Sequence, residues 1–259
     1  MKKSLKLVSA AFMATLAFGM LLPTAVKAEG ETGKPDVTSK GKIKFTQDDT
    51  VNPPNVGPGE GGEEIEEPTQ NPAKLPLKIV SVTDLDFDTH KIVANDLDKK
   101  FNATAFKTKT KGENPKDVIL PHFVRFQDIR SDGENNHYTV SAKLTKQFSD
   151  GNKTLTGASI EYKNLSLVSG TNNATLPDTK DGALVNTFTL TEKGGPETVF
   201  TNKQDGKGFG VFEIVFGDIK KPIENASDYE NIVLTVPGDN VIKTGDYQAE
   251  ITWSIAEVK

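Results

Sequence analysis

The chain has 259 residues and contains no cysteine, a single tryptophan and only three histidines. Without cysteine it can form no disulfide and offers no thiol nucleophile, so its stability must come from its apolar core. The histidines, His90, His122 and His137, lie far apart and show no paired spacing of the kind that binds zinc. Neither a Gly-x-Ser-x-Gly elbow nor a phosphate-binding glycine loop is present. The sequence therefore predicts no cofactor, no metal site and no enzymatic activity.

Long apolar runs are also scarce, and the one that stands out lies at the N-terminus. It extends from about Leu7 to Leu22, follows lysines at positions 2, 3 and 6, and ends at Val26-Lys27-Ala28. A basic start, a short apolar run and a small final residue are the features of a secretory signal peptide. We therefore expect residues 1–28 to be removed on export. A retained membrane anchor is the alternative, but the run is short for a bilayer span, and we expect no transmembrane segment after cleavage.

Basic side chains are outnumbered, with 31 Lys and Arg against 36 Asp and Glu. Removal of residues 1–28 takes away four lysines and no acid, which leaves 27 basic against 36 acidic side chains and a formal charge of −9. An acidic exterior of this kind disfavours a nucleic-acid partner. It also disfavours passive adsorption to anionic polymers. Attachment to a phosphate-bearing wall would then have to rest on local shape, on apolar contacts, on hydrogen bonds, or on a few basic residues grouped on one face.

Residues 50–74 are rich in proline, glycine and glutamate and contain few large apolar side chains. Such a tract buries too little apolar surface to order itself, which predicts a disordered, flexible linker, with a proline-rich docking site as the alternative. Upstream, residues 29–49 form an N-terminal segment in which Ile43 and Phe45 could add one strand to the later domain. Downstream, residues 75–259 are expected to form that domain.

Alternating or continuous apolar stretches separated by turn residues follow one another after Leu75 and predict a series of β-strands. We expect an all-β fold, an antiparallel β-sandwich or barrel. No stretch shows sustained helical periodicity, although 193–206 could hold an irregular turn and 220–230 a short helical piece. The predicted strands are 77–87, 123–129, 138–144, 160–168, 185–190, 210–216, 232–236 and 247–255.

Two of these strands carry the same motif, aromatic-polar-aliphatic: Tyr138-Thr139-Val140 and Trp253-Ser254-Ile255. In each strand the aromatic and aliphatic residues fall on one side of an extended backbone and the polar residues on the other. One interpretation places Tyr138, Val140, Trp253 and Ile255 in the core. The other hypothesis is that these pairs form an apolar surface that binds a wall component or a partner protein. Both can hold if one motif is buried and the other lines a cleft.

The two motifs resemble those of the WxL domain family, cell-surface proteins of low-GC Gram-positive bacteria that carry two Trp-x-Leu motifs. Tyr138 and Val140 stand where the family has Trp and Leu, and Ile255 replaces the second Leu. Family segments are also similar to residues 39–46, the proline-rich tract, 75–77 and 82–87. The resemblance implies a surface protein held noncovalently on the cell wall, with peptidoglycan or a membrane-anchored WxL-interacting protein as partner, and binding residues at the two motifs. A host-facing adhesin is the alternative, and a carbohydrate-active enzyme the third.

Two weaker patterns favour ordinary surface roles. Asp84, Asp86 and Asp88 share the spacing that begins a calcium loop, but the glycine and the closing glutamate of that loop are missing, so a solvated acidic strand edge is favoured. The stretch 176–180, Leu-Pro-Asp-Thr-Lys, resembles a wall-sorting signal without its final glycine, apolar tail and basic end. We interpret it as a turn and expect any wall attachment to be noncovalent.

Overall fold

The computed structural model of the chain describes residues 39–46, 53–59, 62–131, 135–170 and 175–258, so the predicted signal peptide lies outside the described residues. The described residues form β-strands and one 3-10 turn, η1. The elements are β1 (Leu77–Val82), β2 (Lys99–Asn102), β3 (Phe106–Lys109), β4 (Asp117–Leu120), β5 (Phe123–Asp128), β6 (Tyr138–Ser149), β7 (Ser159–Lys163), β8 (Leu165–Ser169), β9 (Thr187–Thr191), β10 (Glu197–Asn202), β11 (Gly210–Phe216), η1 (Ala226–Asp228), β12 (Ile232–Val236) and β13 (Gln248–Glu257).

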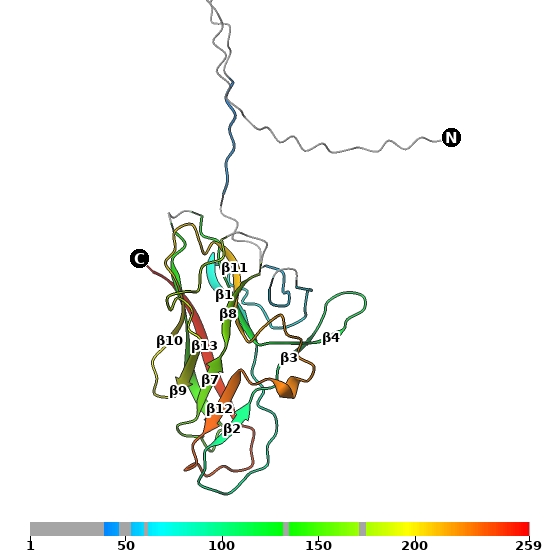
Figure 1. Cartoon of the computed structure of the whole chain (residues 1–259), viewed down its shortest axis with the longest axis vertical. Helices are drawn as coiled ribbons and strands as arrows, with labels where there is room; N and C mark the ends of the chain where they lie inside the picture. The colour runs from blue at the N-terminus through cyan, green and yellow to red at the C-terminus, as the bar shows by residue number, and fades with distance from the viewer. Residues whose placement is uncertain (1–38, 47–52, 60–61, 132–134, 171–174, 259) are drawn as a thin grey trace, which may run out of the picture. The chain divides into compact units, whose positions relative to one another are not determined.

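The strands form antiparallel sheets that share one apolar core (Figure 1). The sheet orders are β1-β5-β11-β8, β10-β6-β13 and β2-β12-β7-β9, with β3 and β4 as a separate hairpin that projects to one side. Core side chains come from strands of all three larger sheets, because alternation directs every second side chain inward. The all-β, antiparallel prediction is confirmed.

Several strand boundaries differ from the prediction. The expected strand 160–168 is two strands, β7 and β8, which pair in different sheets. Asn164 lies between them with a φ of 56°, the left-handed conformation that asparagine tolerates, and there the chain passes from one sheet to the other. The expected strand 77–87 ends at Val82. Strand β10 lies where only an irregular turn was expected, whereas η1 falls within the predicted helical stretch 220–230.

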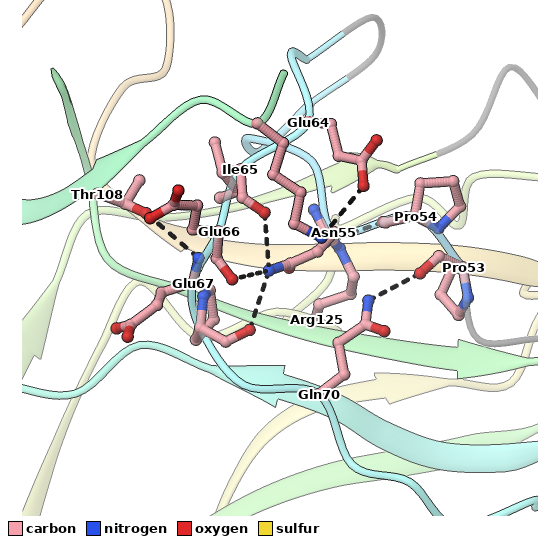
Figure 2. A network of polar contacts seen from close by, with 12 residues as sticks. Pro53, Pro54, Asn55, Glu64, Ile65, Glu66, Glu67, Gln70, Thr108 and Arg125 are labelled. Atoms are coloured by element: carbon pink, nitrogen blue, oxygen red, sulfur yellow. Dashed lines mark hydrogen bonds and ion pairs between the residues drawn. The ribbon is translucent and has the colours of Figure 1, made fainter. Parts of the chain in front are cut away.

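The tract expected to be a flexible linker behaves differently over its described residues, 53–59 and 62–74, which lie against the sheets (Figure 2). Asn55 and Ile65 retain only 6% and 1% of their possible exposure. The Asn55 amide nitrogen donates to the carbonyl oxygens of Ile65, at 3.3 Å, and Pro68, at 3.0 Å. Ile65 also forms a bridge with Thr110. The compact unit that contains the strands extends from Phe45 to Lys259 rather than starting at Leu75.

A buried ion pair explains why this tract is ordered despite its small apolar content. Arg125 on β5 and Glu213 on β11 are direct cross-strand partners, and their side chains approach to 2.8 Å with almost no exposure. Arg125 also donates to the carbonyl oxygens of Pro54 and Val56, and the Gly59 N–H donates to Glu213 at 3.0 Å. Buried charges need hydrogen-bond partners, and the tract supplies them to Arg125 and Glu213. The same hydrogen bonds hold the tract against the sheets.

The segment 39–46 forms no strand within the described residues, in contrast to the strand considered possible there. Ile43 and Phe45 are 77% and 83% exposed.

Candidate functional site: two motif strands beside an aromatic pocket

The two motifs lie side by side. Strands β6 and β13 are antiparallel neighbours, with Ile255 opposite Val140 and Trp253 opposite Ala142. Directly opposite residues point to the same face of a sheet, so both aliphatic motif residues face the core side together. The order β10-β6-β13 places the first motif on a central strand and the second on an edge strand. The prediction that both motifs are extended strands is confirmed.

The first motif is part of the core. Tyr138 and Val140 are completely buried. The Tyr138 ring lies 5.7 Å from that of Phe126 and 6.0 Å from that of Phe200, both in edge-to-face arrangements. Burial raises the pKa of the Tyr138 hydroxyl, which has no hydrogen-bond partner within the described residues. These two side chains offer no surface to a ligand in this structure.

The second motif is only half-buried, because β13 is an edge strand. Trp253 packs against three aromatic rings, with centroid distances of 6.0 Å to Tyr162, 6.0 Å to Phe188 and 5.9 Å to Phe216. Its remaining surface lines a pocket. Ile255 is half-buried on the same face of β13. The first motif is therefore in the core, whereas Trp253 of the second motif lines the pocket and Ile255 does not.

The pocket has a volume of about 1420 Å³, larger than the 300–1,000 Å³ typical of a small-molecule site. The segment 82–93 and the stretch 242–249 both line it. Its floor is apolar and aromatic, whereas acids and lysines stand at its rim. Floor residues include Phe101, Phe148, Leu155, Ile160, Tyr162, Phe216, Ile251 and Trp253, and charged lining residues include Asp84, Asp86, Asp88, Asp246, Lys91, Lys99 and Lys243.

His122 secures one wall of this pocket. Its Nδ1 lies 2.9 Å from the Thr83 hydroxyl and its Nε2 2.8 Å from the Thr104 carbonyl oxygen. Burial lowers the pKa of His122 to about 4, although the Thr104 carbonyl and the Asp84 charge raise it. The ring is therefore neutral at pH 7 and acts as a fixed link between the end of β1 and the loop after β2.

Asp84, Asp86 and Asp88 lie beyond β1 in a stretch that belongs to none of the strands, and Asp88 has a left-handed φ of 63°. They are exposed, and Leu85 and Phe87 between them turn toward the core. Among the described residues no group of three or more His, Cys, Asp or Glu side chains could hold a metal ion.

His90 also lines this pocket, whereas His137 and the sorting-like stretch do not. The His90 ring lies 4.3 Å from that of Phe101, and His137 lies 3.2 Å from Asp205. In the stretch 176–180, Asp178 exchanges hydrogen bonds of 2.9 and 2.8 Å with the Gln204 side chain. The three histidines are therefore not assembled into one site.

The sequence analysis did not single out Arg125 and Glu213. A signal was present, because Glu213 is the one charged residue of the predicted strand 210–216 and Arg125 lies between apolar residues in the predicted strand 123–129, and the two charges are opposite. Such a residue in a buried strand requires a partner. The sequence could not show that the two strands are neighbours.

An all-β domain with a large pocket lined by aromatic side chains is a suitable scaffold for binding. A family model described as WxL domain, surface cell wall-binding, matches residues 32–258. The chain belongs to this family and is a cell-wall-binding surface protein; the family is not one of enzymes. No curated protein and no solved structure matches the chain. The described part of the chain includes no helix with the length and hydropathy of a membrane span.

Proposed function

We propose that this protein is secreted by a Gram-positive bacterium and held noncovalently on the cell wall through its β domain. The partner is peptidoglycan, bound directly or through a membrane-anchored WxL-interacting protein. The observation that carries the proposal is the half-buried Trp253, which stands on a motif strand and lines the large pocket. An aromatic ring at a pocket wall can stack on a sugar face or anchor a protein interface.

Exposed apolar side chains beside the pocket favour a protein partner for part of this contact. Ile92, Val93 and Leu97 are exposed on one loop and Val241 on another. The two loops meet where the Gly238 N–H donates to Asp98 at 2.9 Å, and a Cβ at Gly238 would lie 2.0 Å from the Asp96 carbonyl oxygen. The loops are thus held together at a position that requires glycine, and their apolar residues are presented to solvent.

A pull-down on purified peptidoglycan sacculi, with and without a membrane-anchored partner, tests the proposal. Retention on sacculi alone indicates direct binding, and retention only with the partner indicates a complex. Trp253→Ala should lower retention at least about tenfold, the loss expected for an aromatic anchor, and Trp253→Phe should lower it less. Tyr138→Phe is the matched control, because it changes the aromatic residue of the buried motif.

Thermal melting of each variant separates contact from packing. Loss of retention by Trp253→Ala with a melting midpoint near that of the parent protein would support a contact role. A large drop of the midpoint that accounts for the lost retention would show that Trp253 is only a core residue. Failure of the parent protein to be retained under either condition would refute the proposed attachment.

A further inference from the structure

The buried part of the pocket lining lies between sheets and is almost entirely apolar. Phe148 comes from β6, Tyr162 from β7 and Phe216 from β11, so strands of all three larger sheets contribute to it. The buried lining residues without a polar side-chain group are Phe148, Leu155, Ile160, Phe216, Leu234 and Val236. This part of the pocket therefore offers a ligand mainly apolar contact.

Three buried lining residues do carry a polar side-chain group, namely Thr83, His122 and Tyr162. Thr83 and His122 satisfy each other, with the hydroxyl 2.9 Å from Nδ1, and the second ring nitrogen of His122 lies 2.8 Å from the Thr104 carbonyl oxygen. Neither side chain is left in need of a partner from a ligand.

The Tyr162 hydroxyl is different. The residue is 2% exposed, and its hydroxyl has no hydrogen-bond partner among the described residues. Unlike the equally unpaired Tyr138 hydroxyl, it is not completely enclosed by protein. Since Tyr162 lines the pocket, its hydroxyl is available to a molecule that enters there. Buried hydroxyls in folded proteins normally have a partner, so this one is suited to an acceptor atom of a ligand.

This lining suits a hydrocarbon chain with one acceptor oxygen. A saccharide ring or a peptide backbone would bring several hydrogen-bonding groups against the apolar side chains, and those groups would be left unpaired at a cost in free energy. A hydrocarbon chain loses no hydrogen bond when it leaves water, and its burial is favourable. The carbonyl oxygen of an acyl ester supplies the single acceptor that the Tyr162 hydroxyl lacks.

The charges at the rim bear on the head group of such a ligand. Aspartates outnumber lysines among the lining residues, and the mature chain has a formal charge of −9. An anionic head would be repelled, whereas an uncharged or cationic head would not. The aspartates are Asp84, Asp86, Asp88 and Asp246, and the lysines are Lys91, Lys99 and Lys243.

We propose that the pocket binds the acyl chain of a lipid with an uncharged or cationic head, and that the ester carbonyl oxygen accepts a hydrogen bond from the Tyr162 hydroxyl. The chain lies along the buried apolar lining and the head stays at the rim. The volume of about 1420 Å³ exceeds that of an ordinary small-molecule site. The acyl chain is a ligand in addition to the wall contact proposed for Trp253, and its binding does not require that contact.

Trp253 provides the measurement, because it is the only tryptophan and it lines the pocket. Its fluorescence should shift when the mature protein is titrated with octanoyl-, decanoyl- and dodecanoylglycerol below their micelle concentrations. Each buried CH₂ should lower the dissociation constant about fourfold. Dodecanoate, which carries the same chain on an anionic head, should bind more weakly than dodecanoylglycerol. An unchanged emission, or one dissociation constant for the whole series, would overturn the inference.

Two variants test the place of the chain. Ala249 is half-buried and lines the pocket from β13, so Ala249→Phe fills the space and should raise the dissociation constant at least about tenfold with little change in the melting midpoint. Ser254→Phe adds the same bulk at an exposed position of the same strand and should leave the affinity unchanged.

Tyr162→Phe should weaken the binding of dodecanoylglycerol about fivefold, the contribution of one hydrogen bond. Tyr138→Phe is its control, since it removes a hydroxyl outside the pocket. Parent-like affinity of both Ala249→Phe and Tyr162→Phe would overturn the inference. The titration contains no wall material, so its failure leaves the sacculus pull-down unaffected. An emission shift with soluble muropeptides but not with acylglycerols would overturn the acyl site and support the wall contact.

Discussion

Val140 and Ile255, the aliphatic residues of the two motifs, lie directly opposite one another on antiparallel strands β6 and β13. They are 115 positions apart in the sequence, yet their side chains share one face of the sheet. Because β6 is central and β13 is an edge strand, Val140 is fully buried whereas Ile255 remains half-exposed. The aliphatic residue of the motif is therefore a core residue on β6 and a half-exposed edge residue on β13.

This pairing predicts energetic coupling between the two residues. Val140→Ala should lower the free energy of unfolding by about 2 kcal/mol, because it leaves a cavity in the core. The double variant with Ile255→Ala should deviate from additivity by roughly 0.5–1 kcal/mol. Urea denaturation of the four proteins measures the coupling. Val118 packs in a separate apolar cluster, so Val118→Ala should be additive with Val140→Ala. Equal coupling of Val140 to Ile255 and to Val118 would contradict the pairing.

Tyr138→Phe should leave the free energy of unfolding unchanged or raise it by about 1 kcal/mol. The Tyr138 hydroxyl is buried without a hydrogen-bond partner in the described part of the chain, so its removal eliminates a desolvation cost. The ring contacts with Phe126 and Phe200 are kept. Chemical denaturation provides the test, and a loss of 2 kcal/mol or more would mean, by the usual cost of breaking a buried hydrogen bond, that the hydroxyl has a partner in solution.

Arg125→Met should destabilise the domain by about 3–5 kcal/mol, since it leaves Glu213 buried without its counter-charge. Combining it with Glu213→Met should recover much of this loss. Both variants lose the hydrogen bonds from Arg125 to residues 54–56, so both should become sensitive to limited proteolysis between 53 and 59.

The exposed pair Lys146–Glu250 provides the control for this experiment, because it joins neighbouring strands at 3.2 Å but in solvent. Lys146→Met should cost less than about 1 kcal/mol, as surface ion pairs contribute little. Unchanged protease resistance of the Arg125 variants would show that the tract is held by other contacts.

His122 should make the folded state less stable as the pH falls from 6.5 toward 4. Above pH 6.5 the ring is neutral in both states, so its full contribution to stability is present. Because the folded-state pKa is lowered to about 4, below pH 6.5 the unfolded chain takes up a proton that the folded chain does not. The loss reaches about 3 kcal/mol near pH 4.

The comparison of His122→Gln with the parent protein isolates this effect from the carboxylates that titrate in the same range. The variant should be less stable at pH 7, through its altered hydrogen bonds to Thr83 and Thr104, but should lose less stability between pH 7 and pH 4.5. If the free energy of unfolding of the two proteins changes with pH in the same way, His122 is not a neutral, buried residue.

Local sequence patterns predicted the strands best where burial alternates or is continuous. The predicted bounds of β11 and β12 coincide with the observed ones, since continuous apolar residues are flanked by turn residues there. Short strands such as β2 and β3 were missed because lysines occupy half of their positions. The break at Asn164 was missed because the apolar pattern runs through it, and only the left-handed backbone of that residue separates β7 from β8.

The burial within residues 53–59 and 62–74 was missed for a different reason. The composition of this tract contains too few apolar side chains to predict burial, and its main anchors, Arg125 and Glu213, are about 70 and 150 positions away. Hydrogen bonds to a buried ion pair leave no local periodicity, so neither propensity nor hydropathy could reveal them.

The sequence alone determined that this protein is built from antiparallel strands without disulfides and that its two aromatic motifs are extended, because side-chain alternation is a local property of the chain. Its tertiary structure decided that Tyr138 and Val140 are buried and that Trp253 lines the pocket, because burial depends on whether a strand is central or at an edge. It also decided that Arg125 faces Glu213. Those relationships arise from strand order and register, which connect residues far apart in the sequence.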